Sequence, residues 1–259
     1  MKCKVCNSVI VKVFSAGMLH KYEVSYFLCS ECGFLQTENP FWLKEAYSRP
    51  VNPEDTGYLA RNINFSKKLT ILFCLFFNKD ARFVDYAAGY GVLVRLMRDI
   101  GFDFYWADKY TENLFAKGFE WQDGWPKAEL VTAFECFEHF VQPMEEIENL
   151  LSLSDSIVFS TEILPKPLPQ PDAWWYYGLD HGQHISFYTN DTLEYIANKF
   201  GLKYYSSRDF HILTKTNNLS NAMLKILKLE RFGLHRIFQR GMRSKTWGDF
   251  LALRSLRGP

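Results

Sequence analysis

The chain has 259 residues, of which 47% are hydrophobic, 23% charged and 17% aromatic. This is enough apolar material for one domain of ordinary enzyme size plus a smaller module, and it excludes low-complexity disorder and collagen. Thirty basic residues stand against 29 acidic ones, so the net charge of +1 gives no reason to expect a nucleic-acid binder from the average alone.

Neither a secretory signal nor a membrane span is expected from the sequence. Residues 1–14 alternate polar and apolar side chains instead of forming an apolar signal segment. The longest apolar stretch, Leu69 to Phe77, is far too short to cross a bilayer. We therefore expect a cytoplasmic protein with reduced thiols, in which paired cysteines bind metal more often than one another.

Four of the six cysteines form two CxxC pairs near the N-terminus, Cys3 with Cys6 and Cys29 with Cys32. The 22 residues between the pairs lie just beyond the common range for a four-thiolate zinc ribbon, but the paired pattern is a strong signal for Zn²⁺. A redox pair is the alternative, although a single ion explains all four thiols. The sequence predicts a small zinc ribbon over residues 1–40, which needs its metal to fold.

A strand–turn–helix–strand unit follows a predicted helical linker or lid over residues 41–78. Its four segments are predicted at residues 82–85, 86–91, 92–100 and 102–107. The small residues of the turn let a ligand approach the backbone, and the N-terminus of the helix offers free N–H groups. Such a unit is typical of nucleotide-binding α/β domains.

The turn has the pattern Asp85-x-Ala87-x-Gly89-x-Gly91, which differs from the Gly-x-Gly-x-x-Gly turn of dinucleotide-binding enzymes. It resembles motif I of the class I S-adenosylmethionine-dependent methyltransferases, with alanine in place of the first glycine. Asp108 ends the second strand, where an acid can accept hydrogen bonds from both hydroxyls of a ribose. The resemblance implies that S-adenosylmethionine is the cofactor and that five residues bind it: Asp85, Ala87, Gly89, Gly91 and Asp108. An ordinary strand-to-helix turn is the alternative.

The elements after Asp108 extend this unit to a domain over residues 79–214. Helices are predicted at 145–153 and 191–200, strands at 130–135, 156–161, 202–206 and 210–214, and a weak strand near Phe119. Phe134 and Glu135 end a buried strand, where open α/β sheets bind ligands, and we expect them to flank the cofactor. The predicted fold class is α/β, a Rossmann-like doubly wound methyltransferase sheet with a zinc ribbon before it and a helical tail after it.

The order of these motifs resembles that of the bacterial sugar C-methyltransferases. The cysteine pairs and motif I are followed by Phe134-Glu-Cys-Phe-Glu-His139 and by Gly182-Gln-His-Ile-Ser-Phe-Tyr188. The resemblance implies C- or O-methylation of a sugar or sugar-nucleotide in the biosynthesis of a surface polysaccharide or related glycan. It also implies that His184 is the base, because it matches the histidine of a Tyr-Glu-His cluster in that family.

Two positions of that cluster depart from the family, since His181 replaces the tyrosine and Gln183 replaces the glutamate. Either residue can supply the hydrogen-bond donor that a developing oxyanion requires, beside His184 as the base. Two alternatives stay open. His184 can be a structural residue that caps a helix at Asn190, and His139 can act as the base instead.

Residues 215–259 carry ten basic and two acidic side chains, so the net charge of +1 combines a tail of +8 with a body of −7. Apolar residues at helical spacing predict a basic helical tail over this segment. Such a tail can bind an anionic membrane surface or a diphosphate, or it can pack on the domain with its cations in water. The oligomeric state does not follow from the sequence.

Two other functions compete with methyl transfer to a sugar. Zinc ribbons and basic tails also occur in methyltransferases that act on nucleic acid, but the near-neutral ribbon argues against a nucleic-acid partner here. A non-catalytic interaction protein that has lost the cofactor is the second competitor, and Ala87 and Gln183 motivate it.

Overall fold

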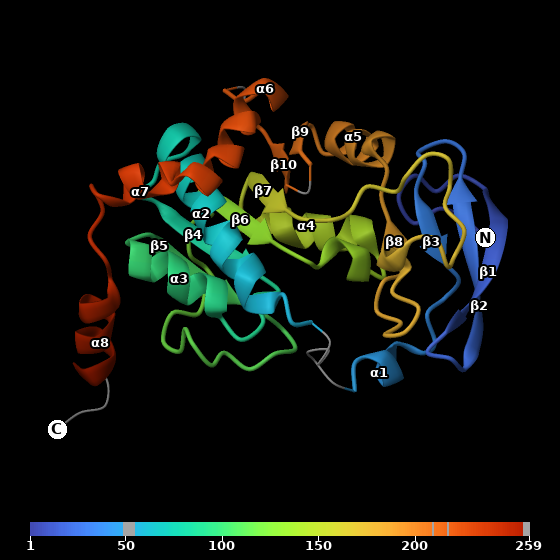
Figure 1. Cartoon of the computed structure of the whole chain (residues 1–259), viewed down its shortest axis with the longest axis horizontal. Helices are drawn as coiled ribbons and strands as arrows, with labels where there is room; N and C mark the ends of the chain where they lie inside the picture. The colour runs from blue at the N-terminus through green and yellow to red at the C-terminus, as the bar shows by residue number, and fades with distance from the viewer. Residues whose placement is uncertain (49–54, 209, 217, 256–259) are drawn as a thin grey trace. The chain divides into compact units, whose positions relative to one another are not determined.

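The computed structural model describes residues 1–48, 55–208, 210–216 and 218–255, which form two compact units (Figure 1). Unit 1 comprises Met1–Glu54, Phe134–Leu151 and Phe159–Lys215. Unit 2 comprises Asp55–Ala133, Ser152–Val158 and Thr216–Pro259. The units therefore interleave along the chain, whereas the sequence predicts consecutive segments with boundaries after residues 40, 78 and 214.

The N-terminal sheet of unit 1 has the strand order β1-β2-β3-β8, with β1 at Ile10–Met18, β2 at Tyr22–Cys29, β3 at Leu35–Thr37 and β8 at Ser186–Phe187. Strands β1 and β2 form an antiparallel hairpin in which Ile10 pairs with Cys29 and Met18 with Tyr22. These two strands lie between the first cysteine pair and the second. Their sheet is larger than a separate ribbon, because β8 from far along the chain pairs antiparallel with β3.

Aromatic side chains form the core between this sheet and the rest of unit 1. Tyr26, Trp42, Tyr177 and Phe187 are almost completely buried. The ring of Tyr26 lies 5.6 Å from that of Tyr177 and 6.1 Å from that of Phe187, between centroids. Each buried aromatic ring contributes about 2–3 kcal/mol through the area it removes from water. This core fixes β8, and hence the residues just before it, against the cysteine segment.

The other elements of unit 1 are α1 (Leu43–Ala46), η1 (Phe137–His139), α4 (Pro143–Leu153), η2 (Trp175–Tyr177), α5 (Asn190–Lys199), β9 (Lys203–Ser207) and β10 (Phe210–Thr214). Among them, α4, α5, β9 and β10 agree closely with the sequence prediction, whereas the short helices η1 and η2 were not predicted. Strands β9 and β10 form an antiparallel hairpin. Thr189 caps α5, because its hydroxyl accepts from the N–H of Thr192 while the Thr192 hydroxyl accepts from the N–H of Thr189.

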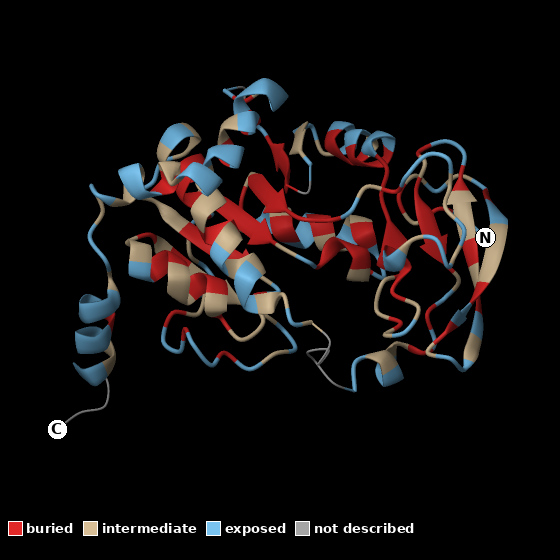
Figure 2. Ribbon diagram, in the orientation of Figure 1, coloured by how far each residue is buried: buried red, intermediate tan, exposed pale blue. Residues whose placement is uncertain are grey.

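Unit 2 contains a sheet in the order β5-β4-β6-β7, with β4 at Arg82–Tyr86, β5 at Asp103–Ala107, β6 at Leu130–Ala133 and β7 at Ser156–Phe159. Strand β4 is parallel to both β5 and β6, and β6 and β7 are buried along their whole length (Figure 2). Helices α2 (Tyr58–Phe76) and α3 (Val92–Ile100) accompany these strands. The strand expected near Phe119 is reduced to a single bridge between Trp106 and Glu120.

The predicted linker over residues 41–78 divides between the units, since α1 belongs to unit 1 and α2 to unit 2. Residues 49–54 of that segment lie outside the described residues, as do residues 217 and 256–259 of the predicted tail. The described part of the tail is helical, as predicted, and contains α6 (Asn221–Leu224), η3 (Lys225–Phe232), α7 (Leu234–Gln239) and α8 (Thr246–Ser255). None of the described helices is both long and apolar enough to cross a membrane.

A buried ion pair fixes the tail within unit 2. Arg98 of α3 donates to both carboxylate oxygens of Asp249 in α8, at 2.7 and 2.8 Å, and Arg95 donates to one of them at 2.9 Å. Leu224 and Leu227 are buried as well. These tail segments therefore pack on the domain, which is one of the possibilities that the sequence leaves open.

Candidate functional site

The turn between β4 and α3 has three residues in the left-handed region, Ala87 (φ 54°), Gly89 (φ 53°) and Gly91 (φ 85°). A β-carbon at Gly91 would lie 2.9 Å from Oδ1 of Asn113, and one at Gly89 would lie 3.1 Å from the hydroxyl of Tyr58. Gly91 is therefore required by conformation and by space, whereas a larger residue at Gly89 would crowd the hydroxyl of Tyr58. The methyl group of Ala87 is exposed, so the alanine is accommodated without a clash.

Asp85 ends β4 with its carboxyl group buried beneath this turn. Burial raises the pKa of Asp85 to about 7; a hydrogen bond from Thr132 opposes the shift, and the charge of Asp108 adds to it. The Thr132 hydroxyl donates to Oδ1 of Asp85 at 2.6 Å. A substantial share of Asp85 is protonated near neutral pH, so this carboxyl can donate a hydrogen bond as well as accept one.

Asp108 organises the same turn through its carboxylate. Its Oδ2 accepts from the N–H of Gly89 at 2.9 Å, and its Oδ1 accepts from the N–H groups of Tyr110 and Thr111 at 2.7 and 2.9 Å. A carboxylate has about four lone-pair positions, so three are used by the backbone. Asp108 thus lies beside the glycine turn as the motif predicts, with room for about one further donor instead of the two expected from a ribose.

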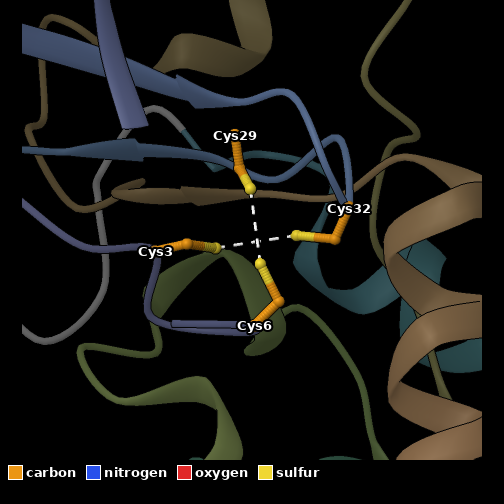
Figure 3. A group of neighbouring side chains, drawn as sticks. All are labelled: Cys3, Cys6, Cys29 and Cys32. Atoms are coloured by element: carbon orange, nitrogen blue, oxygen red, sulfur yellow. Dashed lines mark hydrogen bonds between the residues drawn. The ribbon is translucent and has the colours of Figure 1, made fainter. Parts of the chain in front are cut away.

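The four N-terminal cysteines converge on one point in unit 1 (Figure 3). The sulfur of Cys3 lies 3.6 Å from that of Cys32, the sulfur of Cys6 lies 3.4 Å from that of Cys29, and all four lie within 4.8 Å of one another. None of the four is in a disulfide. Hydrogen bonding to Cys32 lowers the pKa of the Cys3 thiol to about 5, which favours a thiolate in the cluster.

The second cysteine pair also supports the start of α5. The hydroxyl of Thr192 donates to the carbonyl of Cys32 at 2.7 Å. Gly33 has φ 73°, and a β-carbon there would clash with the hydroxyl of Thr189. The cysteine segment is therefore packed directly against the chain that follows His184.

Three histidines form a second cluster in unit 1, two from one segment and His139 from a distant one. The ring of His184 lies 5.0 Å from that of His139 and 4.7 Å from that of His181, between centroids. Burial lowers the pKa of His139 to about 4 and that of His184 well below its ordinary value. Both imidazoles are accordingly neutral at physiological pH, the state in which a ring nitrogen can accept a proton or bind a metal.

Hydrogen bonds to the backbone orient these rings. Nδ1 of His184 lies 2.7 Å from the carbonyl oxygen of Tyr176, and Nδ1 of His139 lies 3.1 Å from that of Gln183. His181 has the opposite arrangement, because its Nδ1 accepts from the N–H of Gln183 at 3.2 Å. The side-chain amide of Gln183 donates to the carbonyl of Ala46 at 2.9 Å, so Gln183 positions the cluster from both its backbone and its side chain.

The alternative in which His184 caps the helix at Asn190 is wrong, because Thr189 caps α5. Phe134 and Glu135 both belong to unit 1. Glu135 is left-handed (φ 52°) with an exposed side chain, and its N–H donates to the Ser160 hydroxyl at 2.8 Å. Glu138 directly precedes His139 in the motif that offers the second candidate base. Sequence reasoning did not select Tyr47, because no local pattern marks it.

The hydroxyl of Tyr47 lies 3.0 Å from Nδ1 of His139, and one ligating atom each of Glu138, His139 and His184 lies within 4.8 Å of the others. These residues come from segments separated by more than 40 positions in the sequence. The arrangement of neutral imidazoles with a buried carboxyl group can take up a proton, donate one, or hold a cation.

The sequence of residues 58–207, more than half of the chain, matches the family described as methyltransferase domain. No curated protein matches the sequence significantly.

Several solved structures resemble the chain at low identity. An O-methyltransferase family 2 protein from Planctomyces limnophilus, in complex with apigenin, is 12% identical with a TM-score of 0.43, and the match covers 67% of this chain and 65% of that one, just under two thirds of its length. Magnesium protoporphyrin IX methyltransferase from Synechocystis, with bound SAM, is 16% identical with a TM-score of 0.38 and coverages of 67% and 90%. The plantazolicin methyltransferase BpumL, in complex with SAH, is 13% identical with a TM-score of 0.49 and coverages of 77% and 89%.

Proposed function

The chain belongs to the methyltransferase domain family and is an enzyme, and on this premise we propose that it transfers the methyl group of S-adenosylmethionine to a small-molecule acceptor. The observation that carries the proposal is the glycine turn of unit 2. Ala87, Gly89 and Gly91 keep it free of bulky side chains, and the first turn of α3 presents N–H groups without partners inside the helix. Asp85 and Asp108 flank the turn with carboxyl groups suited to the amine and hydroxyls of the cofactor.

Calorimetric titration with S-adenosylmethionine tests this proposal. The wild-type chain is expected to bind one equivalent, and Gly91→Ala is expected to weaken binding at least tenfold, because its β-carbon would lie 2.9 Å from Asn113. Gly248→Ala is the matched control, since a β-carbon there meets nothing within 4 Å. Absence of binding by the wild type at millimolar cofactor would refute the proposal. Equal binding by Gly91→Ala would remove the turn from the cofactor site.

The acceptor that we propose is a sugar or sugar-nucleotide of a glycan pathway, methylated at an oxygen or a carbon. The neighbouring rings of His184 and His181 support this proposal, because activation of a hydroxyl or of a ketone needs a proton acceptor beside a donor. We assign proton removal to His184, hydrogen-bond donation to His181 and positioning to Gln183. Phe134 and Glu135 remain our candidates for further cofactor contacts.

Methyl transfer from labelled cofactor to a panel of nucleotide-linked keto-sugars and hydroxyl sugars tests the acceptor class. His184→Asn is expected to lower kcat about 10²–10⁴-fold, the usual contribution of a positioned base. It should leave the affinity for S-adenosylmethionine unchanged. RNA is the comparison acceptor, and methylation of RNA alone would replace the sugar proposal by the nucleic-acid one.

We also propose that the four cysteines bind Zn²⁺. Zinc–sulfur bonds of about 2.3 Å in a tetrahedron place sulfurs about 3.8 Å apart, close to the two distances of 3.4 and 3.6 Å in the cluster. The ion would be structural, since all four positions are taken by protein sulfur. Zinc analysis of protein purified without added metal should give about one ion per chain, and a content far below one would refute the site.

A peripheral contact of the tail with an anionic membrane surface is a further proposal. Phe232 and Ile237 are 74% and 62% exposed on a segment of net charge +8. Co-sedimentation with phosphatidylserine vesicles should fall sharply in Phe232→Ser/Ile237→Ser. No binding by the wild-type chain at low salt would end this proposal.

A further inference from the structure

We propose that Glu138, His139 and His184 hold a divalent first-row transition-metal ion that binds an oxygen of the acceptor. The inference rests on the proposed function and refines it: the lone pair of His184 acts on the acceptor through the ion instead of removing its proton directly. It adds a second metal site to unit 1, distinct from the four cysteines in position and in ligand type.

The three side chains already converge. One carboxylate oxygen of Glu138 and one nitrogen each of His139 and His184 lie within 4.8 Å of one another. Three ligands bound to one ion at about 2.1 Å lie about 3.0–3.6 Å from one another, at angles of about 90–120°. Side-chain adjustments of about 1 Å therefore bring all three ligands onto one ion. All three residues belong to unit 1.

The hydrogen bonds of the two rings leave the correct nitrogen available. A carbonyl oxygen can only accept a hydrogen bond, so the Nδ1 atoms of His139 and His184, which face carbonyls of Gln183 and Tyr176, carry the protons. The hydroxyl of Tyr47, 3.0 Å from Nδ1 of His139, then accepts from the same N–H group. The lone pair of each ring is then on Nε2. This is the arrangement by which proteins fix the tautomer of metal-binding histidines, with the far nitrogen donating to a backbone carbonyl.

His181 shows by contrast that this arrangement is not general in the cluster. Its Nδ1 lone pair accepts from the N–H of Gln183, so that nitrogen is not available to an ion. The structure therefore separates two histidines that present Nε2 lone pairs from one that presents an N–H group.

Besides the contact of His139 with the carbonyl of Gln183, three hydrogen bonds join the two segments that carry the ligands. The N–H of Ile185 donates to the carbonyl of Glu138 at 2.9 Å. The hydroxyl of Ser186 donates to the carbonyl of Phe140 at 2.7 Å, and that of Tyr188 to the carbonyl of Phe137 at 3.0 Å. These bonds hold η1 against β8, so the ligand atoms are positioned before an ion arrives, as a rigid site requires.

Two imidazoles and one carboxylate favour ions of the Mn²⁺ to Zn²⁺ series, and three protein ligands leave positions open for the acceptor. The ion lowers the pKa of an acceptor hydroxyl, whose proton passes to water. The oxygen then forms the bond to the methyl carbon with its own electron pair. The carbon–sulfur bond of S-adenosylmethionine breaks with its electrons on sulfur, which releases neutral S-adenosylhomocysteine.

Titration with Mn²⁺ tests the site in the full chain, because manganese prefers nitrogen and oxygen ligands to the thiolates of the cysteine cluster. Electron paramagnetic resonance of protein that carries one zinc ion per chain, enough for the cysteine cluster alone, should show one bound Mn²⁺ per chain. Glu138→Gln, His139→Asn and His184→Asn should each weaken Mn²⁺ binding at least tenfold. His181→Gln is the matched control and should bind Mn²⁺ as tightly as the wild type. Unchanged affinity for S-adenosylmethionine, which is assigned to unit 2, shows that each variant is folded.

Two results would overturn the proposal: no Mn²⁺ binding by the wild type at millimolar concentration, or equal affinity in the wild type, Glu138→Gln and His184→Asn. Methyl transfer separates this proposal from the function on which it rests. Full activity in the presence of EDTA would refute a metal-bound acceptor and leave the methyltransferase proposal intact. Loss of S-adenosylmethionine binding with Mn²⁺ binding retained would refute the cofactor proposal alone.

Discussion

The ion pair between Arg98 and Asp249 allows a quantitative prediction about the tail. Both side chains are buried, with exposed fractions of 5% and 8%. Asp249→Asn preserves the shape of the side chain and removes its charge. The buried Arg98 guanidinium then lacks the carboxylate that accepts two hydrogen bonds from it. Removal of one member of a buried pair usually destabilises a protein by about 3–5 kcal/mol.

The contacts that remain to Arg98 place the expected loss at the lower end of that range. Its Nη1 still donates to the carbonyl of Phe104 at 3.1 Å and to the carboxylate of Asp103 at 3.3 Å. We therefore expect the free energy of unfolding of Asp249→Asn to fall by about 3 kcal/mol. Replacing the whole pair, with Arg98→Met and Asp249→Leu, should restore most of this loss because no charge is then buried alone.

Urea denaturation followed by tryptophan fluorescence measures the change. The control is Asp155→Asn, which removes the acid of an ion pair with Lys127 in which each side chain is 48% exposed. The control should change the free energy of unfolding by less than about 0.5 kcal/mol. A loss below about 1 kcal/mol in Asp249→Asn, or an equal loss in the two variants, would refute the argument that burial gives the Arg98 pair its strength.

The same pair predicts the sign of a pH effect. Burial by itself would raise the pKa of Asp249, but hydrogen bonds and charge from Arg98 and Arg95 outweigh it and lower the pKa below its ordinary value. A lowered pKa stabilises the folded state above the pKa of the unfolded chain, near 3.9, and this stabilisation is lost as pH falls through the folded value. The difference in the free energy of unfolding between the wild type and Asp249→Asn should therefore become smaller below about pH 4.

Three further changes test the candidate sites. Ala87→Gly should raise the free energy of unfolding by about 0.5 kcal/mol, because relief of a φ of 54° exceeds the entropy that glycine adds to the unfolded chain, and a loss in urea denaturation would contradict this. Asp85→Asn should have a free energy of unfolding about 4 kcal/mol above that of the wild type at pH 8, and the gap should close toward pH 4. The reason is that the raised pKa of Asp85 makes its ionisation costly only above the pKa of the unfolded chain. A gap that does not depend on pH would exclude this cause. Cys32→Ser should lose zinc and lower the thermal midpoint, whereas Cys74→Ser, outside the cluster, should keep its zinc content.

Local sequence signals gave most of the secondary structure correctly. Helix α3 spans Val92–Ile100, the range that its apolar spacing predicts, and the strands flanking it differ from prediction by one residue at most. These signals succeed because helical and strand periodicity depend on neighbours within about four residues. The cysteine pairs were equally readable, since two intervening residues suffice to bring both sulfurs to one side of a turn.

The histidine cluster needed more than local signals. His184 and His139 were selected individually, as candidate bases. Their shared orientation depends on hydrogen bonds to the carbonyls of Tyr176 and Gln183, which no sequence pattern predicts. Strand β8 has only two residues, too few for a period to be visible, and its place beside β3 is fixed by buried rings such as Phe187 and Tyr26.

The sequence by itself determined the chemistry available to this protein: four thiols at metal-binding spacing, a glycine turn of methyltransferase type, and a basic helical tail. Tertiary structure alone decided that the cysteine segment shares a sheet with the strand after His184, and that Asp249 reaches Arg98 across 151 positions. The physical reason is range. Periodicity and turn chemistry act between near neighbours, whereas burial and long-range hydrogen bonds join residues whose separation leaves no trace in the local pattern.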